Sequence, residues 1–126
     1  MSPKVRNIIG WILTAMLAAL FIWSASMKFI GGGPEMEKGM AEMGLTMDTI
    51  HILGAVEALA IILFIIPRTG VVGTMLLIAY LGGAIATHLE HGQPIMMPII
   101  ISIVLWITAA IRFPELTSRL FGTGTR

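Results

Sequence analysis

Two ionisable side chains interrupt or close long apolar runs of this sequence, and they are the best candidates for chemistry. Glu57 stands near the middle of the run HILGAVEALAIILFIIPR, and Lys28 follows twenty uncharged residues. A charged side chain at the centre of a membrane-spanning helix costs about 2.5–3.5 kcal/mol, so such residues usually face other helices and serve a function. We therefore expect Glu57 to have a partner elsewhere in the chain.

Other polar residues fall near the same end of the predicted helices. His51 begins the run that contains Glu57, while Tyr80 and His88 are eight residues apart, on one face of a later helix. Side chains tilt toward the N-terminus of their helix, so Lys28 and His88, on outward-running helices, lean toward the inner side of the membrane, while Glu57, on an inward-running helix, leans toward the outer side. We predict a polar pocket formed by Lys28, Glu57, Tyr80, His88 and His51, with Lys28 and Glu57 as a partly buried ion pair.

Each of the other polar residues also has a plainer explanation. Tyr80 is equally typical of an amphipathic core residue, and His51 and His91 are typical of a solvated membrane interface. His88 and His91 are three residues apart beside Glu90, which is a spacing that metal ligands use. No fourth ligand is evident, so we predict no metal site. No catalytic role is assigned to any residue.

The composition is that of an integral membrane protein. Of 126 residues, 56% are hydrophobic and only 12% are charged, and the mean hydropathy is +0.91. The net charge of +1 and the lack of a basic, aromatic-rich segment exclude nucleic acid as a partner. With no cysteine, any redox role requires a bound cofactor or a partner protein.

The hydrophobic pattern predicts an all-α fold, a single transmembrane domain over residues 1–126 with four spans. The expected spans cover residues 8–30, 49–66, 70–88 and 95–111, and short connectors between them favour an up-down-up-down four-helix bundle. A signal peptide is the alternative for the first span, but its apolar run is longer than such peptides use. Small residues in the second and third spans predict close helix contacts.

A short helix is expected between the first two spans, over residues 34–45. Met36, Met40, Met43 and Met47 follow one another at steps of four, three and four, which places them on one helical face. We interpret the segment as a helix lying in the membrane interface with this face on lipid or on the bundle. A flexible lid over a ligand is the alternative.

The distribution of lysine and arginine predicts the orientation in the membrane. Cytoplasmic loops carry an excess of these residues. If both termini are cytoplasmic, six of them lie inside and two, Lys28 and Lys38, lie outside. We expect both termini in the cytoplasm, in a membrane of the bacterial inner type. The six are Lys4, Arg6, Arg68, Arg112, Arg119 and Arg126.

Four short motifs resemble the DoxX-like family of small four-helix membrane proteins. They are Met27-Lys28-Phe29 at the end of the first span, Met43-Gly44-Leu45, the Gly54-x-x-Glu57 motif followed by Pro67-Arg68, and Ala86-Thr87-His88 at the end of the third span. Ser24 and Ala25 depart from the family, which often has glycine before the lysine. The resemblance implies a role near quinone-linked sulfur oxidation or membrane redox complexes, with Lys28, Glu57 and His88 as the family's polar residues.

Three functions are compatible with these residues. We favour an accessory bundle that binds a small apolar molecule of quinone type, since it explains a polar pocket without a nucleophile. The second is a membrane oxidoreductase subunit in which Glu57 and His88 exchange protons with a quinone. The third is a small proton-coupled transporter. The expected partners are the lipid bilayer, a redox partner protein and further copies of the chain; the ligand itself stays open.

Overall fold

The computed structural model describes residues 2–122, and all the regular structure in that range is helical, as the sequence predicts. The helices are α1 (Pro3–Ile30), α2 (Pro34–Glu42), α3 (Met47–Ile65), a single 3-10 turn (Pro67–Thr69), α4 (Gly70–Glu90), α5 (Met96–Arg112) and α6 (Pro114–Phe121). The expected first span therefore begins earlier than residue 8. Ser2 caps α1 by accepting a hydrogen bond from the Val5 amide at 3.2 Å, and Pro3 occupies the first turn.

The other helix boundaries also follow from local chemistry. Thr46 accepts a hydrogen bond from the Thr49 amide at 3.2 Å, so α3 begins two residues before the predicted start. The predicted helix 34–45 is present as α2 but ends at Glu42, because Gly44 takes a φ of 74° that ends the turn. Pro98 lies in the first turn of α5, where no amide donor is required.

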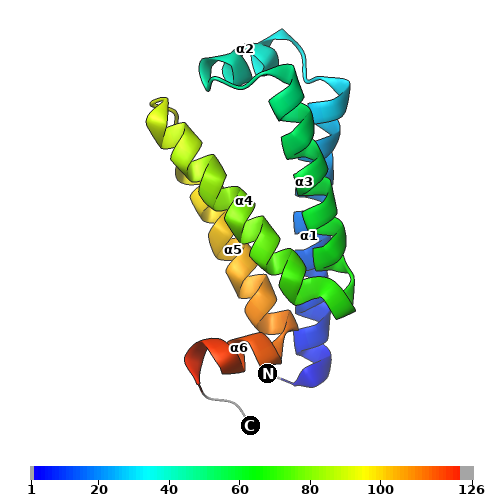
Figure 1. Ribbon diagram of the computed structural model, residues 1–126. Coiled ribbons are helices and arrows are strands. Elements are labelled where there is room, and N and C mark those ends of the chain that lie inside the picture. The colour runs from blue at the N-terminus through cyan, green and yellow to red at the C-terminus, as the bar shows by residue number, and fades with distance from the viewer. Residues whose placement is uncertain (1, 123–126) are drawn as a thin grey trace.

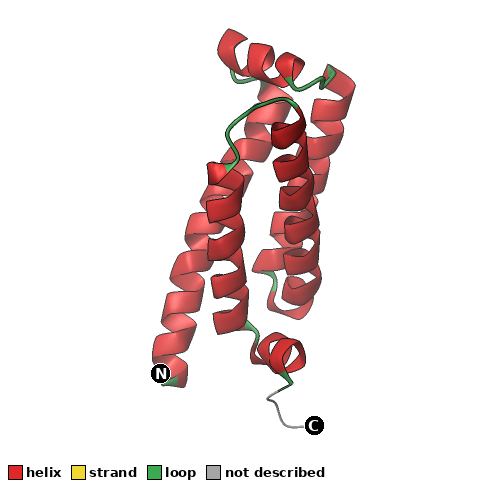
Figure 2. Ribbon diagram, turned by 90° about the vertical axis from the view of Figure 1, so that its left-hand side faces the viewer, coloured by secondary structure: helices red, strands yellow, loops and turns green. Residues whose placement is uncertain are grey.

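The four long helices pack in a ring, each against two neighbours. α1 contacts α3 and α5, and α4 contacts α3 and α5. Successive long helices run in opposite directions along the molecule (Figures 1 and 2). The N-terminus, the Pro67–Thr69 turn and α6 lie at one end, which we call the terminal end. The opposite end carries α2 and the α4–α5 connection, and we call it the α2 end.

The outer surface is that of a multi-pass membrane protein. Helices α1, α3 and the 3-10 turn with α4 are each long and apolar enough to cross a bilayer, and α5 with α6 makes a bent fourth candidate. Large hydrophobic side chains point outward along these helices; Met16, Trp23, Ile52 and Met75 are each more than 60% exposed. Such a surface is stable against lipid and not against water.

Glycines let the helices approach closely toward the terminal end. A Cβ atom on Gly73 of α4 would overlap the backbone of Phe64 in α3, and one on Gly70 would overlap the ring of Phe113. Gly10 of α1 lies against Arg112, whose Cγ is 2.9 Å from where a Cβ atom would be. Small residues at these crossings therefore close this half of the bundle, as the sequence leads us to expect. Toward the other end, α4 diverges from α3 (Figure 1).

Arg112 joins α1, α3 and α5 at the terminal end. Helix α3 stops before Pro67, which has no amide proton, so the last carbonyls of α3 lack their usual helical donors. Arg112 donates from Nη1 to the Phe64 carbonyl at 2.7 Å and from Nη2 to the Ile65 carbonyl at 3.1 Å. Its guanidinium carbon lies 4.6 Å from the ring centroid of Trp11 and 4.7 Å from that of Phe113. These contacts cap α3 and hold α1 against it.

Helix α6 is not predicted from the sequence, which suggests only a short tail there. It begins at Pro114, a favourable first residue, and turns away from α5 by 107°. Leu116 packs against the core at Phe113. The helix therefore lies across the terminal end instead of continuing α5 (Figure 2).

The Arg112 contacts predict a large loss of stability on truncation. Arg112→Ala removes a charged donor from two helix-end carbonyls, and we expect the free energy of unfolding to fall by about 3 kcal/mol. Arg112→Lys should keep only part of this stability, because an ammonium group cannot reproduce the planar guanidinium, whose two nitrogens donate to two carbonyls at once. Thermal unfolding in mild detergent, followed by circular dichroism, measures both. Arg119→Ala is the control, because Arg119 is exposed on α6; equal melting of all three variants and the parent would contradict this assignment.

Candidate functional site

Lys28 and Glu57 form a buried ion pair between α1 and α3. Lys28 Nζ lies 3.1 Å from Glu57 Oε1, and the two residues are only 7% and 2% exposed. Lys28 also donates to Ser24 Oγ at 2.8 Å, one turn earlier on α1. An ion pair this buried is stable only when each charge keeps its hydrogen bonds, and here the lysine does so through two oxygens.

Gly54 explains how the two helices come close enough for this contact. It lies one turn before Glu57 on α3, and a Cβ atom there would be 3.1 Å from both Lys28 Cβ and the Phe29 ring. A side chain at position 54 would therefore push α1 away at the level of the lysine. The Gly54-x-x-Glu57 spacing thus places a carboxylate one turn below a close helix crossing.

The ion pair lies beside a cavity of about 810 Å³ in the half of the bundle that faces the α2 end. Residues of α1, α3, α4 and α5 and of the α2 region line it, and most of them are apolar. Its polar lining includes Ser24, Lys28, Glu57, Tyr80, Thr87 and His88. Cavities of this size with a few convergent polar groups are typical of small-molecule sites.

Tyr80 and His88 reach this cavity from α4. Lys28 Nζ is 5.8 Å from the centroid of the Tyr80 ring, and the Tyr80 hydroxyl lies close to the Glu57 carboxylate. His88 Nδ1 lies 2.6 Å from the Ala84 carbonyl oxygen, which can only accept. Nδ1 is therefore the donor, and in the neutral ring Nε2 carries a lone pair. The structure thus places four of the five predicted pocket residues around one cavity.

His51 is the predicted pocket residue that does not line the cavity. It is exposed at the start of α3, and its ring stacks on Phe29 with centroids 5.8 Å apart and an angle of 12° between the planes. It lies six residues, or about one and two-thirds turns, before Glu57, which turns it away from the polar pair. The interfacial interpretation of His51 fits this placement better than a pocket role.

Sequence reasoning missed the contribution of Ser24 to the cavity. Ser24 accepts from Lys28, and its spacing of four residues on one helix is the signal that could have identified it. Met40 and Met43 line the cavity from the α2 region, so part of the methionine face lies on the bundle beside the site, a position that the sequence left open. In the part of the chain described, no group of three or more His, Asp or Glu side chains is placed to hold a metal ion.

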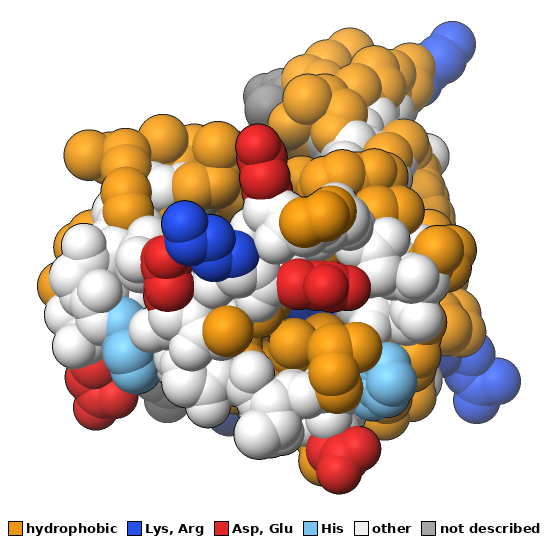
Figure 3. Space-filling model, turned by 90° about the horizontal axis from the view of Figure 1, so that it is seen from above, with side chains coloured by type: hydrophobic (Ala, Val, Ile, Leu, Met, Phe, Trp, Pro, Cys, Tyr) orange, Lys and Arg blue, Asp and Glu red, His pale blue; other side chains and the backbone are white. Residues whose placement is uncertain are grey.

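Seen from the α2 end, this face carries acidic, basic and histidine side chains with hydrophobic ones between them (Figure 3). His91 belongs to it, exposed after the last turn of α4 with Nδ1 2.9 Å from the Thr87 carbonyl. The mixture contrasts with the apolar flanks of the long helices and is typical of a surface in contact with water.

Comparison with known proteins gives one family. A sequence model described as the DoxX-like family matches residues 12–111, which include Lys28, Glu57, Tyr80 and His88. No curated protein and no solved structure matches the chain. The match covers α3 and α4 completely, α5 up to residue 111 and α1 from residue 12 onward, and it confirms the resemblance drawn from the short motifs.

The ion pair predicts that two single mutants are less stable than their combination. Removing one member of a buried pair strands the other charge and costs about 3–5 kcal/mol. We expect Lys28→Met and Glu57→Gln each to lower the free energy of unfolding by that amount, and the double mutant to regain most of it. Thermal melting in detergent measures the cycle.

Ser24→Ala is the matched control, because it removes a hydrogen bond from Lys28 and leaves both charges in place. It should cost about 1 kcal/mol. If the two single losses simply add in the double mutant, the side chains do not interact in solution.

Proposed function

We propose that this protein, which belongs to the DoxX-like family, is an accessory membrane bundle that binds a small, largely apolar molecule of quinone type. The observation that carries the proposal is the buried Lys28–Glu57 pair at the wall of a mostly apolar cavity of about 810 Å³. A polar anchor inside an apolar cavity selects a ligand with a small polar head and an apolar body.

The hydrogen bonds of Lys28 favour a ligand that accepts a hydrogen bond. An ammonium group has three N–H donors, and Ser24 and Glu57 take two of them among the described residues. The third can meet a ligand oxygen in the cavity. A quinone carbonyl is such an acceptor, and its flat ring suits walls that include Tyr80 and Phe21.

Proton exchange with the ligand is the second candidate function. Glu57 and His88 line the same cavity, and His88 Nε2 is the free acceptor of the neutral ring. No hydrogen bond joins these two side chains among the described residues, so a proton would pass between them through the ligand or water. Such a subunit would need a bound redox cofactor or a redox partner protein, because the chain holds no cysteine.

Transport is supported less well. The cavity lies in one half of the bundle, while glycine contacts and Arg112 hold the helices together in the other half. An exporter would have to separate helices there. We therefore place the transporter behind the two ligand-binding functions.

We further propose that the four long helices cross the membrane as an up-down-up-down bundle with both termini cytoplasmic. The terminal end carries Lys4, Arg6 and Arg68, in keeping with the positive-inside rule. Helix α2 would then lie in the outer interface above the cavity, and the ligand would approach from that side. A bacterial-type inner membrane fits this arrangement.

The proposal predicts which substitutions weaken ligand binding. Tyr80→Phe and His88→Ala remove polar groups from the cavity wall, and each should weaken binding of a short-chain quinone at least fivefold, about 1 kcal/mol. Trp106→Phe is the control, because Trp106 is 40% exposed on α5 and does not line the cavity. Isothermal titration in detergent gives the dissociation constants. Equal losses in all three variants would indicate general destabilisation.

The orientation predicts the labelling of introduced cysteines. The native chain has none, so single cysteines at Arg68, Lys38 and His91 can be tested separately in whole cells with an impermeant thiol reagent. We expect labelling at positions 38 and 91 and none at 68 until the membrane is permeabilised. External labelling of position 68 would overturn the orientation.

A further inference from the structure

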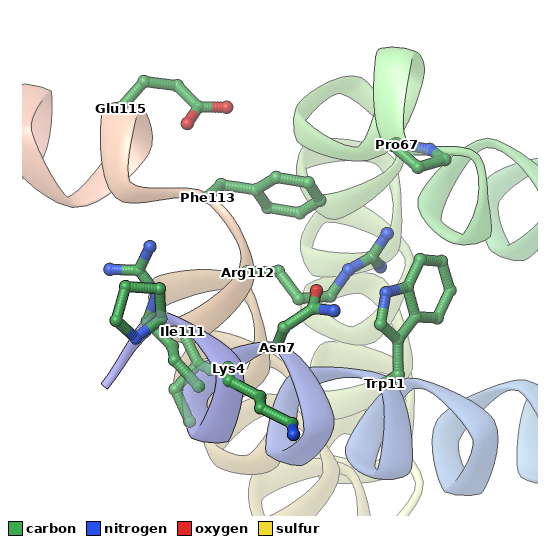
Figure 4. Close-up of a pocket in the computed structure, with 10 residues that line it drawn as sticks. Lys4, Asn7, Trp11, Pro67, Ile111, Arg112, Phe113 and Glu115 are labelled. Atoms are coloured by element: carbon green, nitrogen blue, oxygen red, sulfur yellow. The ribbon is translucent and has the colours of Figure 1, made fainter. Parts of the chain in front are cut away.

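A second cavity lies at the terminal end, far along the bundle from the Lys28–Glu57 pair. It measures about 620 Å³ and is lined mainly by residues of the first turns of α1 and of the α5–α6 junction. In Figure 4, Lys4 and Trp11 extend from α1, while Arg112, Phe113 and Glu115 extend from the end of α5 and the start of α6. Arg6 also lines it. The proposed quinone-type ligand does not involve this cavity.

The lining of this cavity is positively charged. Three cations, Lys4, Arg6 and Arg112, outnumber the one acid, Glu115. Within residues 2–122 no ion pair joins any of these cations to Glu115, so their charge is not cancelled locally. Arg112 uses two of its five N–H donors on the carbonyls of α3, which leaves donors for a further acceptor.

The position of the cavity relative to the membrane indicates which group would accept hydrogen bonds from these cationic side chains. Helix α6 turns 107° from α5 and exposes Leu120 and Phe121, as a helix at a membrane surface does. Trp11 is 40% exposed at this level and stacks on Arg112, and tryptophan is typical of the headgroup region. In the proposed membrane orientation, on which this inference rests, the cavity opens at the level of the lipid phosphates.

We propose that this cavity binds the headgroup of an anionic phospholipid, with its phosphate held by Lys4, Arg6 and Arg112. Basic pockets beside transmembrane helices bind such headgroups on the cytoplasmic side of membranes. Asn7 and Glu115 line the same cavity. The Asn7 amide can donate a hydrogen bond to a headgroup hydroxyl or accept one from it, and the Glu115 carboxylate can accept one. The lipid would thereby hold α1 and the α5–α6 junction together.

Native mass spectrometry of the purified full chain tests the assignment. The protein in neutral detergent is titrated with phosphatidylglycerol, with phosphatidylcholine and, separately, with inorganic phosphate. We expect phosphatidylglycerol to bind at least tenfold more tightly than phosphatidylcholine. The Lys4→Gln, Arg6→Gln double variant should lose about fivefold in affinity for each cation removed. Both residues are exposed, so the fold should survive; Lys4→Gln alone should show about half of the effect on a logarithmic scale.

The Arg68→Gln, Arg119→Gln double variant is the matched control. It removes the same charge from the same end of the molecule, but neither residue lines the cavity. We expect less than a twofold change in its affinity for phosphatidylglycerol. Equal losses of affinity in the two double variants would show diffuse electrostatic attraction in place of a specific site. Equal binding of phosphatidylglycerol and phosphatidylcholine would show that no anionic-lipid site exists. Competition by inorganic phosphate at the concentration at which the lipid binds would indicate a free-phosphate site instead.

Discussion

The buried Lys28–Glu57 pair is the constraint on which the arrangement of this bundle depends. Two charges taken out of water are stable only if they compensate each other, and here α1 and α3 lie close together at the level of the pair. Gly54 permits the approach, and Ser24 supplies a further acceptor for the ammonium. The pair therefore restricts the rotation of both helices, because each must turn its charged residue toward the other.

The rest of the bundle is built asymmetrically around that pair. Toward the terminal end, Gly70 and Gly73 bring α4 onto Phe113 and α3, and Arg112 closes the end of α3 through two carbonyls. Toward the α2 end the glycines of α4 make no such contact: a Cβ atom on Gly82 or Gly83 would meet no neighbouring helix or side chain within 4 Å. Close packing of α4 on α3 at one end and their divergence at the other leave the cavity that lies beside the ion pair.

The sequence predicted much of this arrangement because membranes reduce the choices. A lone carboxylate in a spanning helix requires a partner, and Lys28 has a long side chain that leans toward Glu57 from an oppositely directed helix, which is why their contact could be predicted. The role of Arg112 could not be predicted, because in the sequence it is one of several charges at the ends of spans. Its hydrogen-bond acceptors are backbone carbonyls, which leave no signal in the sequence. His51 was assigned to the pocket from its depth alone, and its stacking on Phe29 depends on helix rotation.

The charge balance of the site restricts what the cavity can accept. Lys28 and Glu57 together are neutral, and each is the nearest compensation for the other. An anionic ligand would compete with Glu57 for the lysine, and a cationic ligand would compete with the lysine for Glu57; either would leave one buried charge poorly compensated, at a cost of several kcal/mol. A neutral acceptor disturbs neither charge, because it needs only the third N–H of Lys28. The pair therefore favours an uncharged, carbonyl-bearing ligand over organic anions and over the cationic compounds that small exporters carry.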